Sequence, residues 1–264
     1  MTDLHLHSNA SFDSEELPEN YIRAATDAGA QYFGFSEHYD FDVICEGGSR
    51  SLPDVGAYLA RAAALQHTTN VKILRGLEFG YVSAALPRYR EILSAFPLDY
   101  CILSVHTIAG RGDCYFPEFY KGLSKRAAYE DYFNAVLESV RADLDYNIVG
   151  HVGYVCRNSP YEDRRIIYKE FSGILDQILK EIIQRGVCLE INTSTGKSGA
   201  NLIPDHDVIE RFLELGGKFM TFGSDAHHAA RLLDGYPRVT EFLKSRGVNS
   251  LYRFEKGKKT EEKF

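Results

Sequence analysis

The stretch DLHLHS, residues 3–8, places two histidines, His5 and His7, two positions apart in a short apolar run. In a β-strand, side chains two positions apart point to the same face of the sheet. The pattern therefore predicts a first strand that presents both imidazoles on one side. Two polar rings stand here where a buried strand would carry valine or isoleucine, so the pair needs partners from elsewhere in the chain.

Six further short runs, rich in apolar, β-branched and aromatic residues, each predict another strand. They are YFGFSEH (32–38), VKILRGLEFGY (71–81), YCILSVH (100–106), YNIVGHVG (146–153), VCLEINTS (187–194) and KFMTFGSDAH (218–227), with a weaker eighth candidate in SLYRFEK (250–256). Amphipathic stretches between these runs predict helices, and several of them end in Gly, as helix C-termini prefer. The helical stretches are 18–30, 54–69, 125–143, 168–186 and 204–217.

Strands that alternate with helices over short connections are typical of βα units and a parallel sheet. Seven or eight such units favour a closed α/β barrel. The alternative is an open doubly wound sheet, but the sequence lacks the G-x-G-x-x-G turn that is typical of a dinucleotide-binding sheet. A chain of 264 residues without a linker-like segment fits one domain. We expect a barrel core over about 1–247, then a short C-terminal strand and charged tail over 248–264, with EKGKKTEEK (255–263) solvated and frayed.

Composition excludes several classes of function. The formal charge of −7, with no Lys/Arg-rich face, argues against binding to nucleic acid. No apolar run approaches the length needed to span a bilayer, and the first residues carry no basic leader, so we expect no membrane partner and a cytoplasmic location. The five cysteines are widely spaced and odd in number, which predicts reduced thiols, mostly packed: Cys45, Cys101, Cys114, Cys156 and Cys188.

Ionisable residues gather at one end of the predicted strands. Eight of them lie at or just past the C-terminal end of a run: His5, His7, His38, Glu78, His106, His151, Asp225 and His227. A parallel barrel brings these ends together on the face where barrel enzymes place their reactive groups. Imidazoles and carboxylates suit Zn²⁺, Mn²⁺ and Fe²⁺, and eight or nine ligands predict two or three divalent ions.

The motifs DLHLHS (3–8), SEHYDF (36–41), GLEFGY (76–81), LSVH (103–106), GH (150–151) and GSDAH (223–227), in this order, resemble the PHP (polymerase and histidinol phosphatase) superfamily. The resemblance runs from Asp3 to about His227. It implies a distorted (β/α)7 barrel of the TIM type, with a trinuclear metal site at the C-terminal ends of the strands.

The resemblance also implies how the ligands divide among three metal ions. One ion takes His5, His7, Glu78 and Asp225. A second shares Glu78 as a bridge and adds His106 and His151. The third takes His38, His227 and the residue six places after His7, which is a histidine in many members and Asp13 here. A helix N-cap in the stretch DSEE (13–16) is the alternative role for Asp13.

A metal cluster of this kind favours hydrolysis at phosphorus by attack of a metal-bridging hydroxide. Two cations in βα loops, Arg157 and Lys197, are candidates for binding the phosphate and stabilising transition-state charge. Arg157 matches an arginine of histidinol-phosphate phosphatases of the PHP class. Lys197 stands where that class carries arginine, and an ammonium lacks the bidentate fork of a guanidinium.

GLEFGY (76–81) and SLYRFEKGK (250–258) are closest to the histidinol-phosphatase branch of the superfamily, so we expect hydrolysis of L-histidinol phosphate, a step of histidine biosynthesis. Acids and aromatics should line the pocket for the ammonium and imidazole of this substrate, and candidates by position are Tyr81, Tyr115, Phe116 and Tyr154. Two alternatives stay open. One is a PHP phosphoesterase for another monoester, such as a nucleotide, a sugar phosphate or phosphotyrosine, and the other is a non-catalytic metal-bound scaffold.

Overall fold

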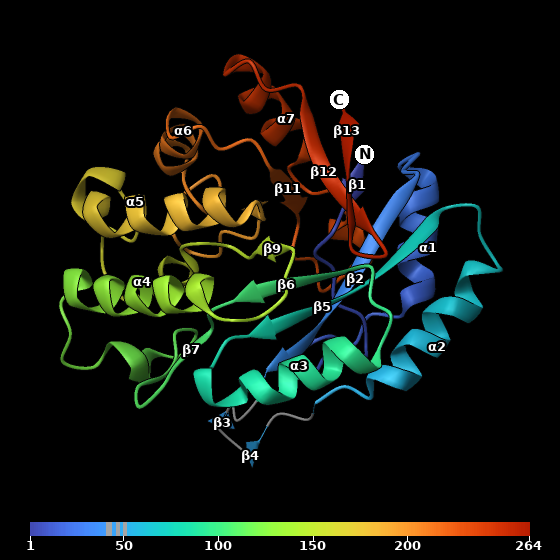
Figure 1. The fold of residues 1–264 in the computed structure, drawn as a ribbon, viewed down its shortest axis with the longest axis horizontal. Coiled ribbons are helices and arrows are strands. Elements are labelled where there is room, and N and C mark those ends of the chain that lie inside the picture. The colour runs from blue at the N-terminus through green and yellow to red at the C-terminus, as the bar shows by residue number, and fades with distance from the viewer. Residues whose placement is uncertain (41–43, 46–47, 50–51) are drawn as a thin grey trace.

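Seven parallel strands form the central sheet of this computed structural model, which describes residues 1–40, 44–45, 48–49 and 52–264 (Figure 1). Their spatial order is β1-β2-β5-β6-β9-β10-β11. The strands are β1 (Thr2–Asp3), β2 (Tyr32–Asp40), β5 (Lys72–Gly80), β6 (Tyr100–Ser104), β9 (Ile148–Val149), β10 (Cys188–Asn192) and β11 (Met220–Gly223). Each one overlaps a run that the sequence predicts as a strand, although β1 begins at Thr2 and β2 continues to Asp40, beyond the predicted bounds.

The first and last strands of the sheet meet, so the sheet curls into a nearly closed barrel. The Leu4 amide donates to the Phe222 carbonyl at 3.2 Å, and the His7 amide donates to the Ala226 carbonyl at 2.9 Å. A parallel bridge between Leu6 and Ala226 lies between these bonds. Strands β1 and β9 are only two residues long, so each pairs with its neighbours in the sheet over a short distance and the barrel is distorted. The predicted fold class is therefore confirmed.

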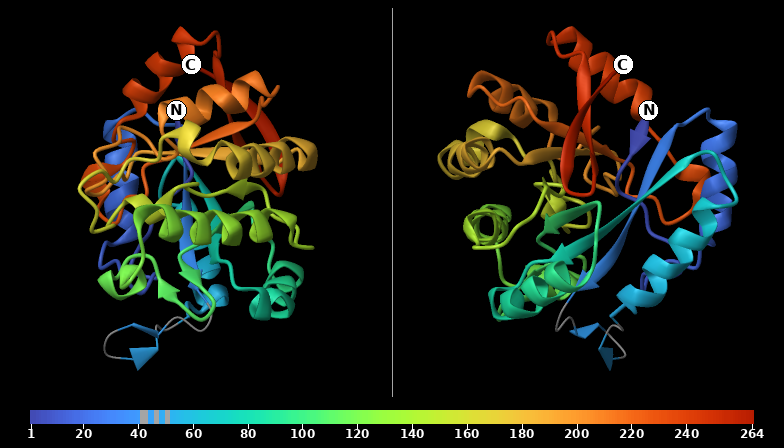
Figure 2. Two further views of the ribbon diagram at one scale, coloured as in Figure 1. Left: turned by 90° about the vertical axis from the view of Figure 1, so that its left-hand side faces the viewer. Right: turned by 45° about the vertical axis from the view of Figure 1, so that its right-hand side comes forward.

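Helices surround the strands on the outside of the barrel (Figures 1 and 2). They are α1 (Pro18–Asp27), α2 (Val55–Gln66), α3 (Leu86–Ala95), α4 (Lys125–Arg141), α5 (Tyr168–Arg185), α6 (His206–Glu214) and α7 (Tyr236–Ser245). Helix α4 begins where the Ser124 hydroxyl accepts from the Ala127 amide, and it buries an aromatic stripe that includes Tyr132 and Phe133. Helix α5 ends at Gly186, whose φ of 67° is the left-handed conformation that glycine adopts without strain.

Small hairpins extend two of the loops at the C-terminal ends of the strands. They pair β3 (Ile44–Cys45) with β4 (Gly48–Ser49), and β7 (Thr107–Ile108) with β8 (Gly112–Asp113). Phe41, the last residue of the SEHYDF motif, lies outside the described residues.

A C-terminal hairpin of β12 (Ser250–Glu255) and β13 (Lys258–Lys263) closes the N-terminal end of the barrel. Its turn is held at the start of β6, because Asp99 accepts hydrogen bonds from the amides of Lys256 and Gly257, each at 2.9 Å. The expectation of a frayed charged tail is wrong. The Lys259 ammonium lies 3.2 Å from the centre of the Phe219 ring and donates to the Gly186 carbonyl, so this charged segment packs as an edge strand.

Four cysteines are buried free thiols, namely Cys101, Cys114, Cys156 and Cys188, whereas the side chain of Cys45 lies outside what the structure describes. Among the described residues, every helix is too short or too polar to cross a membrane.

Candidate metal centre

All nine predicted metal ligands lie at the C-terminal mouth of the barrel. His38 and Glu78 sit opposite each other on the paired strands β2 and β5. The others lie in the loops that follow the C-terminal ends of the strands: His5, His7, Asp13, His106, His151, Asp225 and His227. Most of these side chains are buried, and Asp13 and His227 are the more open members, at the edge of the cluster.

The Glu78 carboxylate lies at the centre of the cluster, and its Oε2 atom faces three imidazoles. Oε2 lies 3.2 Å from Nε2 of His5, 3.6 Å from Nε2 of His7 and 3.1 Å from Nδ1 of His38. Strand β1 ends at Asp3, so the expectation that the first strand itself carries His5 and His7 is wrong, and both rings face one carboxylate oxygen from the segment that follows the strand.

The other carboxylate oxygen of Glu78, Oε1, faces a second group. It lies 2.9 Å from Nε2 of His151 and 3.2 Å from Nε2 of His106, and these two ring nitrogens are 3.3 Å apart. One carboxylate therefore separates two sets of histidines, as a bridging ligand must. The resemblance assigns His5 and His7 to the first ion and His106 and His151 to the second, whereas it assigns His38, which also faces Oε2, to the third.

Asp225 completes the first group from the neighbouring chain segment, which follows β11 and pairs with the segment that carries His5 and His7. Its Oδ1 atom lies 3.4 Å from Nε2 of His7 and 3.9 Å from Nε2 of His5. The residue has a φ of 52°, an uncommon backbone conformation for a side chain other than Gly, Asn or Asp. This backbone turn directs the carboxylate back into the cluster.

Asp13 faces the third predicted group. Its Oδ2 atom lies 3.0 Å from Nε2 of His227 and 3.4 Å from Nε2 of His38. The alternative role as a helix N-cap is wrong, because α1 begins at Pro18 and Leu17 holds the cap position. The carboxylate is thus free of the helix and lies beside the two histidines with which the sequence grouped it.

The chemistry of these donors fits divalent cations. Within the described part of the chain, Nε2 of His5, Nε2 of His7 and Oε2 of Glu78 are buried and have no hydrogen-bond partner. Burying converging polar atoms without partners is costly, and a cation held among them would remove that cost. Four overlapping groups of three potential ligands lie close enough to hold an ion: His7, His38 and His227; His5, Glu78 and His151; His5, His7 and Asp225; and His38, Asp40 and His106.

Charges around the cluster favour the ligand forms of several groups. Burial would raise the pKa of Glu78, but His5, His106 and His38 hold it well below its usual range. Burial lowers the pKa of His7 to about 3, so this imidazole is neutral at pH 7. Both groups thus offer lone pairs. Burial would also lower the pKa of His38, but Asp13 and the neighbouring carboxylates raise it to about 9, so a metal ion there would displace a proton.

Three buried carboxylates outside the predicted set hold the histidines in place. Glu190 on β10 lies 2.5 Å from Nδ1 of His5 and accepts from the backbone amide of His151 at 2.7 Å. Asp40 lies 3.2 Å from Nδ1 of His106. Glu37 accepts from the Ser11 hydroxyl, which in turn contacts Nδ1 of His7 at 3.2 Å.

Sequence reasoning missed these three carboxylates, although a signal was present. A carboxylate within an otherwise apolar strand, such as Glu190 in CLEIN (188–192), is costly unless it is paired. When the nitrogen of a ligating imidazole that does not bind the metal donates a hydrogen bond to a carboxylate, that bond fixes the ring orientation and the tautomer. The three residues therefore have the geometry of supports for the ligands.

A cavity of about 470 Å³ opens over the cluster, and Arg157 lines it. Arg157 follows the short helix η3 (Tyr154–Cys156); its Nη2 donates to Oδ2 of Asp225 at 2.6 Å, and its guanidinium lies 4.9 Å from the centre of the Tyr154 ring. The cavity is lined by Phe12, Asp13, His38, His106, Tyr115, Phe116, His151, Tyr154, Arg157, Asn158, Ser194, Gly196, Asp225 and His227.

Lys197 and the four aromatic candidates differ in whether they line this cavity. Lys197 is exposed and is not part of the cavity lining, although its neighbour Gly196 is. Of the aromatic candidates, Tyr115, Phe116 and Tyr154 line the cavity. Tyr81 lies outside that lining; it is buried, and its hydroxyl donates a hydrogen bond to Oε1 of Glu138 at 3.1 Å.

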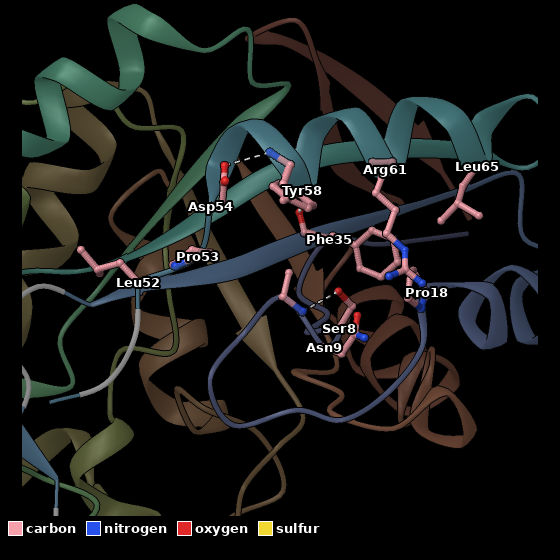
Figure 3. Close-up of a pocket in the computed structure, with 13 residues that line it drawn as sticks. Ser8, Asn9, Pro18, Phe35, Leu52, Pro53, Asp54, Tyr58, Arg61 and Leu65 are labelled. Carbon is pink, nitrogen blue, oxygen red and sulfur yellow. Dashed lines mark hydrogen bonds between the residues drawn. The ribbon is translucent and has the colours of Figure 1, made fainter. Parts of the chain in front are cut away.

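A second hollow, of about 360 Å³, lies between α2 and the loop that follows β1 (Figure 3). Two charged residues that line it, Asp54 and Arg61, already have partners. Asp54 caps α2 by accepting from the Ala57 amide, and Arg61 donates to both carboxylate oxygens of Glu19 at 3.1 Å. Most of the other side chains that line this hollow are apolar. Six of the nine predicted metal ligands line the other cavity, namely Asp13, His38, His106, His151, Asp225 and His227.

A βα barrel that collects histidines and carboxylates at the C-terminal ends of its strands is the architecture of a metal-dependent barrel hydrolase. The family model of the PHP domain matches residues 3–194, and the chain belongs to this family.

Individual relatives narrow the comparison. The histidinol-phosphatase of Lactococcus lactis subsp. lactis is 33% identical over 252 residues, which cover 96% of this chain and 93% of that protein. The crystal structure of the L. lactis histidinol phosphate phosphatase, in complex with Zn, L-histidinol and phosphate, matches with a TM-score of 0.88 at 32% identity and covers 98% of both chains. A structure from Listeria monocytogenes shares the fold, with a TM-score of 0.77 at 18% identity over 90% of this chain and 99% of that one.

Proposed function

We propose that this protein hydrolyses L-histidinol phosphate to L-histidinol and phosphate. The observation that carries the proposal is the cluster of histidines around the two oxygens of Glu78, with a guanidinium beside it in the same cavity. The likeness to the L. lactis enzyme over nearly the whole of both chains supports the choice of substrate.

Two or three divalent ions are proposed as cofactors, with Zn, Mn or Fe as candidates. His5, His7, Glu78 and Asp225 would hold the first, Glu78, His106 and His151 the second, and Asp13, His38 and His227 the third. When bound, such ions lower the pKa of water and stabilise the attacking and departing oxygens of a displacement at phosphorus. The presence of Zn in the related crystal structure supports zinc as one candidate.

Arg157 is proposed to bind the phosphoryl oxygens. A guanidinium has five N–H donors, and Asp225 accepts from Nη2, whereas Nε is buried without a partner among the described residues. The side chain thus has donors to spare in the cavity. Charge-assisted hydrogen bonds from arginine to phosphate are strong and directional, so they would orient the ester and stabilise charge in the transition state.

Lys197 keeps a weaker part in the proposal. Its exposed side chain lies next to the cavity lining, so it would act on the phosphate through long-range attraction rather than through a fixed hydrogen bond. Tyr115 and Phe116 offer aromatic surface at the cavity for the imidazole of histidinol.

We also propose that the enzyme works in the cytoplasm. The four buried free thiols support this location, because cysteines stay reduced in that compartment.

A panel of phosphate monoesters tests the function. On protein loaded with Zn²⁺ or Mn²⁺, kcat/KM for L-histidinol phosphate should greatly exceed kcat/KM for p-nitrophenyl phosphate, a nucleotide, a sugar phosphate and phosphotyrosine. A higher kcat/KM for one of the others would replace the substrate. A metal content of fewer than two ions per chain, together with no hydrolysis of any ester, would instead favour a scaffold.

A further inference from the structure

Gly196 lies against Arg157 at the one point where a side chain would displace it. A Cβ atom at position 196 would overlap Cγ of Arg157 and lie 2.8 Å from the Arg157 carbonyl oxygen. Contacts this short do not occur for real Cβ atoms, and the backbone oxygen cannot swing away as a flexible side chain can. The side chain and backbone of Arg157 can therefore adopt their observed positions only because residue 196 has no side chain.

The loop that contains Gly196 is tied to the Arg157 loop by backbone hydrogen bonds. The Lys197 amide donates to the Arg157 carbonyl at 2.9 Å. Arg164 joins the same two loops, because its Nη1 donates to the Lys197 carbonyl at 2.8 Å and its Nε donates to the Ser159 carbonyl at 2.6 Å. The contribution of residues 196–197 to the site is thus made by the backbone.

Arg157 is held on three sides as a result. Its Cγ packs on Gly196, its guanidinium stacks near Tyr154, and its Nη2 binds Asp225. A long, flexible side chain that is held before its ligand arrives loses less conformational entropy on binding.

We propose that Gly196 is a positioning residue for phosphate recognition, which acts by bracing Arg157 in the cavity. The inference rests on the proposed function of Arg157 as the phosphate-binding cation. It also gives the segment around Lys197 a role that does not need the lysine ammonium.

The test uses inorganic phosphate as the probe and measures its dissociation constant by calorimetry on the zinc-loaded chain. Gly196→Ala should weaken phosphate binding by about tenfold, comparable to the loss of a charge-assisted hydrogen bond. Because phosphate binding is measured directly, the result does not depend on which ester the enzyme prefers.

Backbone strain is separated from the side-chain contact by a control in the same loop. Gly196 has a φ of +56° and Gly199 a φ of +72°, but a Cβ at Gly199 would meet nothing within 4 Å. Gly199→Ala should therefore leave phosphate binding unchanged. Gly196→Asn, a residue that tolerates left-handed backbone, should still weaken it. Thermal unfolding midpoints and zinc content would verify that each variant is folded and loaded.

A double-mutant cycle with Arg157→Ala identifies the path of the effect. If Gly196 acts through the arginine, Gly196→Ala should add less than about twofold to the loss in the Arg157→Ala background. The proposal is overturned if folded Gly196→Ala and Gly196→Asn bind phosphate as the parent does. It is also overturned if Gly199→Ala causes the same loss of phosphate affinity, or if the parent binds no phosphate. Additive effects of Gly196→Ala and Arg157→Ala on phosphate affinity would overturn it as well. If the parent binds phosphate but does not prefer L-histidinol phosphate, the proposed substrate is wrong, whereas the proposed role of Gly196 in positioning Arg157 is unaffected.

Discussion

The two ends of the barrel are built from opposite kinds of side chain. At the N-terminal end, Phe254 of the closing hairpin packs with Leu4, Leu74 and Tyr100 in an apolar cluster. At the C-terminal end, buried ring nitrogens and carboxylate oxygens converge without enough hydrogen-bond donors. The first arrangement stabilises the fold on its own, whereas the second needs a bound cation to become favourable.

Stability and chemistry are thus separated along the barrel axis, as is usual for parallel βα barrels. Substitutions at the mouth should change metal content and activity more than folding. Substitutions at the closed end should do the reverse.

The largest effect is expected from Glu78→Gln. This change keeps the shape but removes the charge that faces both groups of histidines, so metal content should fall and kcat should fall by roughly 10³-fold or more, since metal stabilisation amounts to several kcal/mol. Metal analysis and steady-state kinetics check it. Glu138→Gln, a matched change at an exposed residue bonded to Tyr81, should leave both unchanged; equal losses in the two variants would contradict the central place of Glu78.

Phe254→Ala should produce the opposite pattern at the closed end. Removing a ring that is 4% exposed should lower the free energy of unfolding by about 3 kcal/mol. Denaturant unfolding measures this loss, while kcat and metal content per folded chain should stay at parent values. Phe254→Leu should recover most of the stability. A large fall in kcat with unchanged stability would erase the distinction between the two ends.

Glu190→Gln tests whether the mouth depends on residues beyond the ligands. Because this carboxylate contacts both His5 and the His151 amide, the variant should bind zinc about 10- to 100-fold more weakly. Competition with a chromogenic chelator measures the affinity. Glu181→Gln, on an exposed pair with Arg141, is the matched control. Parent-like zinc affinity in Glu190→Gln would show that the support is dispensable.

Asp13→Ala should have the smallest effect, because Asp13 lies at the open edge of the cluster. We expect the loss of one ion per chain and a fall in kcat of about tenfold, at the low end of what a group supporting a metal site contributes. Asp13→His, which restores an imidazole ligand, should recover the third ion. An unchanged ion count in Asp13→Ala would exclude the carboxylate as a ligand.

Much of this organisation could be predicted from the sequence, because strands buried on both faces leave short apolar runs and the ligands follow them directly. The supports could not be predicted in the same way. Glu190 is one carboxylate in a strand, and only the register of the barrel places it across from His5. The first strand of the closing hairpin was predicted in SLYRFEK, but the second, β13, was missed because its charges mask a strand that is stabilised by pairing with β12.

The two cations show the same limit for loops. Arg157 and Lys197 are equivalent by position in the sequence, yet the first lines the cavity and the second is exposed beside it. The path of each loop depends on contacts such as that of Gly196 with Arg157, which no periodic pattern encodes.

An anomalous difference map at the metal absorption edge, from crystals of the metal-loaded protein, tests the central claim most directly. We expect one peak between Oε2 of Glu78 and the imidazoles of His5 and His7, and a second between Oε1 and the imidazoles of His106 and His151. A third peak is expected beside Asp13. A map without peaks on both sides of the Glu78 carboxylate would contradict the account.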